Sequence, residues 1–347
     1  RTGMSLFLGT VLGLIGMAAA FYIGHIFPIV LSKDMWLLIM MGYIFVASIA
    51  PVWILLQPRD YLNSFLLYLM IIAAFLGICF YQPTMEISPF VGFDLGGGQW
   101  LFPVLFVTVA CGAISGFHAT QSPLMARCIK NEKYGRPIFF GSMITEGIVA
   151  LIWAAAATYF YHNNGMGENN AAVVVDSITK EWLGTVGGIL AVLGVIAAPI
   201  TSGDTAFRSA RLIVADFLGL EQKSMRRRLY ICIPMFVLAI GLLLYSLRDA
   251  NGFNMIWRYF AWANQTLAVF TLWAITVFLA VSKKTYIITL IPALFMTCVC
   301  STYICIAPEG LGLSHAVSYG VGIACVVVAA VWFYIWISKQ KTRKLSE

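Results

Sequence analysis

Residues 285–306 read TYIITLIPALFMTCVCSTYICI, a run in which no side chain is charged. An α-helix rises about 1.5 Å per residue, so a run of this length can cross the roughly 30 Å hydrocarbon core of a bilayer. Lys283 and Lys284 stand directly before the run. The stretch therefore predicts a membrane-spanning helix that begins beside a basic turn.

Similar apolar runs occur along the whole chain, at approximately 5–27, 37–56, 62–80, 101–117, 138–161, 183–201, 229–247, 259–281, 285–306 and 315–337. Of the 347 residues, 61% are hydrophobic and 11% are charged, whereas a soluble domain carries about 25% charged residues. A water-soluble core cannot hide so much apolar surface. We therefore predict an all-α integral membrane protein with about ten transmembrane helices, some of them interrupted.

The basic residues predict the orientation. With both ends on the cytoplasmic side and alternating spans, 18 of the 22 Lys and Arg side chains lie inside, and the exceptions are Lys33, Lys180, Arg248 and Arg258. This bias satisfies the positive-inside rule and explains the net charge of +7 without nucleic acid. The expected partners are therefore a lipid bilayer and a small-molecule substrate.

The chain reads as a single transmembrane domain, 1–347, with two basic cytoplasmic features. Residues 203–228 mix apolar side chains with arginines and predict an amphipathic helix on the membrane surface. Residues 338–347 form a basic tail. The eight cysteines make no CxxC pair and no zinc-ligand spacing, so no metal or cofactor is expected beyond a coupling H⁺ or Na⁺.

A first interruption is predicted at residues 115–123, SGFHATQSP. Gly116 permits unwinding, and Ser122 before Pro123 is a good N-cap and N1 pair for a fresh helix. A helix that restarts offers backbone donors to an anionic solute. The candidate substrate-binding residues here are Ser115, Gly116, Phe117, His118, Thr120, Gln121 and Ser122. The alternative is a helix that simply leaves the membrane at a loop.

A second interruption is predicted at residues 198–204, APITSGD. Thr201, Ser202 and Asp204, with freed carbonyls, suit a cation or proton site, and Arg208 lies one turn beyond Asp204. The alternative is a capping box, in which Thr201 and Asp204 only start a helix.

Two further polar positions lie inside apolar runs. Glu146 is acidic and well inside a run, which suits a proton carrier in a coupled transporter, or a protonated structural residue. Asn264 and Gln265 are adjacent and point to different helix faces, so one can line a cavity while the other bonds a neighbouring helix. The alternative is that they serve only as structural glue between helices. Asn264 and Gln265 join the predicted substrate-binding residues, and Glu146 joins Thr201, Ser202, Asp204 and Arg208 as a predicted coupling residue.

Three strings carry a resemblance to a known family. PVWILLQPRDYL at 51–62, ACGAISGFHA at 110–119 and GDTAFRSAR at 203–211 resemble the carbon starvation protein A family, and the resemblance spans nearly the whole chain. TQSPLMAR at 120–127 resembles its shorter members. Members usually begin with an AGxGPxxGP run and a later HD(F/Y) motif. Neither occurs here and the chain starts with Arg1, so we expect the amino-terminal portion of the family to be missing.

The resemblance implies a carrier in the bacterial cytoplasmic membrane, with an inverted-repeat architecture, that takes up peptides or pyruvate. We therefore predict a secondary active transporter of a small carboxylate or peptide nutrient, driven by a proton or cation gradient. The alternatives are a nutrient sensor that binds solute without moving it and an integral-membrane enzyme. No nucleophile–base pair, metal cluster or Walker A pattern in the sequence supports an enzyme or an ATP-driven pump.

Overall fold

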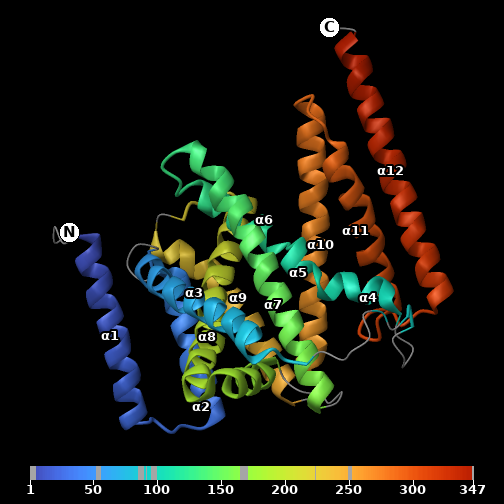
Figure 1. Cartoon of the computed structure of the whole chain (residues 1–347). Coiled ribbons are helices and arrows are strands. Elements are labelled where there is room, and N and C mark those ends of the chain that lie inside the picture. The colour runs from blue at the N-terminus through green and yellow to red at the C-terminus, as the bar shows by residue number, and fades with distance from the viewer. Residues whose placement is uncertain are drawn as a thin grey trace. The chain divides into compact units, whose positions relative to one another are not determined.

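The computed structural model describes residues 5–51, 56–84, 90, 92–94, 100–164, 171–222, 224–248 and 252–345. Helices account for almost all of these residues, as Figure 1 shows. The chain divides into two compact units, each assembled from two separate segments. Unit 1 combines residues 1–86 and 152–239, and unit 2 combines residues 87–151 and 240–347. The prediction of an all-α protein is confirmed.

Unit 1 is organised around a long helix. It contains α1 (Leu6–Ile26), α2 (Lys33–Ile49), α3 (Leu56–Tyr81), the end of α7 (Gly141–Asn164), α8 (Ala171–Phe217) and the start of α9 (Met225–Arg248). Helix α8 packs against both α2 and α3. Ser5 and Ser32 cap α1 and α2 by accepting hydrogen bonds from the amides of Leu8 and Met35.

Unit 2 contains three long helices and a chain of short ones. The short elements are α4 (Leu101–Thr108), α5 (Ala110–Ala113), α6 (Phe117–Ala126), η1 (Glu132–Tyr134) and η2 (Arg136–Phe140), which lead into the start of α7. The long ones are α10 (Gly252–Val281), α11 (Ile287–Ile306) and α12 (His315–Leu345). Helix α11 packs against α10, α12 and α4.

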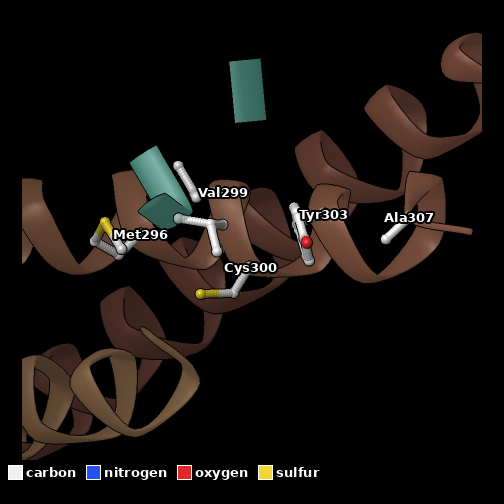
Figure 2. Close-up of a cluster of buried hydrophobic side chains, with 6 residues drawn as sticks. Met296, Val299, Cys300, Tyr303 and Ala307 are labelled. Atoms are coloured by element: carbon white, nitrogen blue, oxygen red, sulfur yellow. The ribbon is translucent and has the colours of Figure 1, made fainter. Parts of the chain in front are cut away.

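The core of unit 2 lies along α11. Val299 is fully buried and Met296 nearly so, and with Cys300, Tyr303, Ala307 and Val107 they form one cluster. Figure 2 shows five of these side chains following one another along the helix. Their spacing of three or four residues is the spacing of one helix face. Trp262 Nε1 on α10 donates to the Cys300 carbonyl at 3.0 Å and ties α10 to this face.

Large apolar side chains are also exposed on nearly every helix. Helix α1 contains no buried residue, and Leu6 and Phe7 are more than three-quarters exposed. In a soluble protein such surfaces would aggregate, but hydrocarbon solvates them without cost. Seven helices among the described residues are long and apolar enough to span a bilayer, or eight if α4 and the helix after it form one bent span. The count of ten and the inverted repeat stay predictions.

The first predicted interruption is present, but its restart lies elsewhere. Helix α5 ends at Ala113 and α6 begins at Phe117 rather than after Ser122, so the break lies at residues 114–116. A separate bend of 51° lies upstream, between Leu101–Thr108 and Cys111–Pro123. Ser115 Oγ accepts a hydrogen bond from the Phe117 amide at 3.3 Å, so it satisfies a donor at the helix start. Because this turn is already formed, Ser122 lies within α6 and Pro123 is accommodated inside it. The expected Ser122–Pro123 cap was wrong.

The second predicted interruption is also wrong in position. Residues 198–204 are helical within α8, and the departure from helical geometry occurs at Gly184, where φ is +62°. Positive φ is open to glycine without steric cost. Asp204 does not start a helix but lies inside α8, and its carboxylate pairs with Arg59 of α3. Neither freed carbonyls nor a capping box is found at 199–204.

Candidate functional site

Unit 2 brings His118 and Glu146 together. His118 is the second residue of α6, directly after the interruption, and Glu146 lies on α7. His118 Nε2 and Glu146 Oε2 are 3.1 Å apart, at ion-pair distance but without the alignment of a hydrogen bond. Both side chains are 36% exposed. An imidazole and a carboxylate at this distance can share or exchange one proton, and each stabilises the charged form of the other.

Small residues, two of them glycines, allow α5 and α7 to come close together beside His118 and Glu146. A Cβ on Gly112 would lie 2.5 Å from the Cβ of Ala150, and one on Gly147 would lie 3.4 Å from the Gly112 carbonyl oxygen. Helices α5 and α7 therefore approach each other closely at small residues, next to the elements that carry His118 and Glu146. Such small-residue contacts are a common way for helices to pack in membranes.

At Gly116, the segment between α5 and α6 lies in close contact with the backbone of α10. A Cβ on Gly116 would collide with the Asn264 carbonyl oxygen and would lie 2.8 Å from both the Ala268 amide nitrogen and the Leu267 Cβ. No larger residue fits without moving the backbone of α10. The predicted binding segment and the predicted Asn264–Gln265 step are therefore in direct contact.

The Asn264 and Gln265 side chains are both buried, at 8% and 1% exposed. Gln265 Oε1 has no hydrogen-bond partner among the residues that the structure describes. A buried amide oxygen without a donor destabilises the folded protein. Gln265 Oε1 can therefore accept a hydrogen bond from a donor group of a molecule that enters the unit. Within α6, Thr120 Oγ1 donates to the Phe117 carbonyl at 2.8 Å, while Gln121 and Ser122 are half-buried.

The remaining predicted residues, Thr201, Ser202, Asp204 and Arg208, belong to unit 1. Asp204 is fully buried, and its carboxylate forms a two-pronged ion pair with Arg59 of α3, with Arg59 Nη2 3.2 Å from Asp204 Oδ1. Arg59 also donates to Tyr43 of α2 at 2.9 Å and to Asp60 at 2.8 Å. Thr201 accepts the Thr205 hydroxyl at its backbone carbonyl, and Ser202 is exposed.

Arg208 does not pair with Asp204 as expected. Its Nη2 donates to the carbonyls of Ala47 and Ala50, at 2.6 and 2.7 Å, where α2 ends. Arg228 Nη1 donates to the Ile49 carbonyl of the same helix end at 2.9 Å. The last carbonyls of a helix lack partners within it and carry a partial negative charge, so cations stabilise them.

Arg208 lies outside the seven candidate spans among the described residues, and beyond the predicted span 183–201. Burial, followed by repulsion from Arg211, lowers the pKa of Arg208 to about 10. Arg208 is therefore still protonated at neutral pH and holds the end of α2 as a cation.

Arg59 was missed as a site residue, although it belongs to the PRDY string at 58–61. The signal available was an Arg–Asp step at the start of an apolar run. Sequence reasoning also passed over Glu181, whose Oε1 accepts from Tyr159 at 2.5 Å and from Tyr81 at 3.1 Å. No group of three or more metal-ligating side chains occurs within the described part of the chain.

These features define a multi-pass membrane protein in which polar and charged groups are set between apolar helices. The chain matches the family described as carbon starvation protein CstA over residues 2–185 and 163–303, and it belongs to that family. It is 30% identical to the peptide transporter CstA of Escherichia coli over 320 residues, covering 72% of this chain and 45% of that protein. No solved structure matches the chain.

Two further relatives complete the comparison. The peptide transporter CstA of Bacillus subtilis is 30% identical over 73% of this chain and 51% of its own length. The pyruvate/proton symporter BtsT of Escherichia coli is 36% identical over 43% of this chain and 23% of its own length. The chain thus spans about half the length of these CstA relatives, and it is a bacterial membrane protein of their family.

Proposed function

We propose that this chain is part of a secondary active transporter that imports a small carboxylate or a short peptide together with protons. The relatives named as peptide transporters and as a pyruvate/proton symporter support this reading. The observation that carries it is the His118–Glu146 pair, 3.1 Å apart and directly after a helix interruption. A proton site and a helix start then lie on neighbouring residues.

The arrangement suggests a simple coupling step. The start of α6 carries the partial positive charge of a helix amino terminus, which favours a carboxylate group of the solute. Its first three amides already donate to Ser115 and Gly116, so the attraction comes from the helix dipole and not from free donors. A proton taken up by the His118–Glu146 pair adds positive charge beside the same helix start. Solute and proton therefore stabilise each other, which is the reciprocal coupling that symport requires. Gln265 Oε1, buried and without a donor in the described structure, is the acceptor we propose for an amide or hydroxyl of the solute.

A cation site at Thr201, Ser202 and Asp204 has less support. The Asp204 carboxylate is already neutralised by Arg59, and the backbone around it is helical. We therefore favour H⁺ over Na⁺ as the coupling ion. The proposed setting is the bacterial cytoplasmic membrane with both chain ends inside, in line with the distribution of Lys and Arg.

Reconstituted protein tests the proposal. Purified protein in liposomes should accumulate labelled pyruvate or a labelled dipeptide when the outside is made acidic, and accumulation should stop when a protonophore removes the pH gradient. Accumulation that ignores the pH gradient would refute proton coupling. Binding without accumulation would favour a nutrient sensor, and chemical conversion of the solute would favour an enzyme.

A pair of matched variants tests the proton site. Glu146→Gln should abolish gradient-driven uptake and leave folding intact, because Gln keeps the shape but cannot carry a proton. Glu132→Gln, which removes an exposed carboxylate at η1, is the control and should transport as the parent does. Parental uptake by Glu146→Gln would remove Glu146 from the mechanism.

A further inference from the structure

A cavity of about 410 Å³ lies in unit 2, where α10 ends, α11 begins and α12 runs past them. Its lining includes Lys283, Lys284, Tyr286, Trp336, Ile337 and Gln340. Figure 1 shows the α10–α11 turn and the last part of α12 at the same end of these helices. The volume falls in the range of ligand pockets, roughly 300 to 1,000 Å³.

The cavity lies at the depth where spans end. Two candidate spans end at Val281 and Gln340 and a third begins at Ile287, all beside the cavity. Trp336 and Tyr286 are the residue types that favour the boundary between hydrocarbon and water. The walls are thus placed at the headgroup level of a bilayer, whichever way the chain is oriented.

The cavity is lined by two positively charged side chains and, among the described residues, by no acidic one. From residue 277 to residue 345 the only acidic side chain in the sequence is Glu309. Glu309 lies beyond the opposite end of α11, where it accepts from Tyr303 at 2.7 Å. Lys283 and Lys284 are both exposed, and no acidic side chain lines the cavity that they border.

Lys283 stands where a glycine is favoured. Its φ is +55°, and the amides of Lys283 and Lys284 bond back to the carbonyls of Ala280 and Leu279, at 3.2 and 2.8 Å. This is a Schellman motif, in which the left-handed position usually holds glycine because a Cβ is strained there. A lysine at this position makes the turn less stable than a glycine would, and it places a charged side chain at the cavity.

The walls are tied together by contacts within the protein. Thr276 Oγ1 donates to Thr289 Oγ1 at 2.8 Å and joins α10 to α11 below the turn. Phe333 is buried and packs its ring against Tyr286 and Trp336, with centroids 5.6 and 5.8 Å apart. A ligand that enters would therefore find a preformed apolar wall with two ammonium groups at its rim.

We propose that this cavity binds an anionic phospholipid, with the phosphate on Lys283 and Lys284 and the first methylene groups against Trp336 and Ile337. A lipid supplies both parts of this chemistry, the anion and the chain, and it arrives at this depth by lateral diffusion. Basic pockets between transmembrane helices bind anionic headgroups in this way. The site is separate from the proposed transport residues.

Thermal unfolding of the detergent-purified protein, together with native mass spectrometry, tests the site. Phosphatidylglycerol should raise the unfolding midpoint and stay bound as one molecule, whereas phosphatidylcholine with the same chains and inorganic phosphate should do neither. The double variant Lys283→Gln/Lys284→Gln should bind phosphatidylglycerol roughly 30-fold more weakly, about five-fold per lysine. The control Lys130→Gln/Lys133→Gln removes two exposed cytoplasmic charges and should bind as the parent does.

Lys283→Gly separates lipid binding from folding. Glycine relieves the strained backbone, so this variant should unfold at a higher temperature without lipid and yet gain less from phosphatidylglycerol. Equal effects of the two lipids, an equal effect of phosphate alone, equal losses in the control variant, or full lipid affinity in the Lys283 and Lys284 variants would each overturn the proposal.

Discussion

The ion pair between Arg59 and Asp204 gives the sharpest stability prediction. Asp204 is fully buried, and besides Arg59 its carboxylate accepts only from Thr205, at 3.1 Å, among the described residues. Arg59 is 17% exposed and keeps Asp60 and Tyr43 as partners if Asp204 is lost. Substituting Arg59 alone and substituting Asp204 alone should therefore lower the free energy of unfolding by different amounts, because the first leaves a buried carboxylate and the second leaves a partly paired guanidinium.

Removing one partner of a buried pair costs about 3 to 5 kcal/mol. Asp204→Asn should fall at the lower end, about 3 kcal/mol, since the Arg59 charge retains other partners. Arg59→Met should fall at the upper end, about 5 kcal/mol, since the carboxylate is left in an apolar interior. The double variant leaves no unpaired charge and should lose no more than about 3 kcal/mol, far less than the sum.

The measurement is chemical unfolding of purified protein in detergent micelles, followed by tryptophan fluorescence for all four forms of the pair. Asp216→Asn, an exposed position on the same helix, is the matched control and should change stability by less than about 0.5 kcal/mol. The reasoning is refuted if Asp204→Asn equals Asp216→Asn, or if the costs of the two single variants simply add.

Three further predictions concern unit 2. Gly116→Ala should destabilise the protein by about 1 to 3 kcal/mol, because the new Cβ meets α10 backbone that cannot yield. Gly241→Ala, which meets nothing within 4 Å, should not destabilise it, and equal unfolding midpoints for the two would contradict the close contact. His118→Gln should weaken the pH dependence of uptake, measured as initial rate in liposomes across pH 5 to 8, and an unchanged profile would exclude His118 from coupling. Tyr303→Phe should cost about 1.5 to 3 kcal/mol in chemical unfolding, because Glu309 loses a charged hydrogen bond, and no loss would contradict it.

Local pattern was enough for the helices and for one interruption. Apolar runs near 285–306 and 315–337 became α11 and α12 with boundaries within a few residues, apart from the polar extension of α12. The crowd of polar residues around Gly116 marked a true break at residues 114–116. Glycine is also required there by the close contact with α10. Both signals are short-range properties of the chain.

Long-range pairing could not be predicted. The APITSGD stretch contains a proline and a good capping pair, yet α8 continues through it, and the Asp204 carboxylate is engaged by Arg59, 145 residues away. Arg208 likewise donates to carbonyls at the end of α2 and not to Asp204, one turn away on its own helix. The meeting of His118 and Glu146 was also hidden, because the two residues lie on different helices and their packing is not encoded in local pattern.

The alternation of segments between the two units bears on how the protein is made. The amino-terminal part of unit 1 ends at residue 86, and its second part begins only at residue 152, after a whole segment of unit 2. Arg59 is therefore translated about 145 residues before Asp204, its partner. At about 5 to 20 residues per second, Asp204 follows after roughly 7 to 30 s, and until then Arg59 has only early partners such as Asp60 and Tyr43. Helices early in the chain therefore reach their final pairing only when late ones have been made.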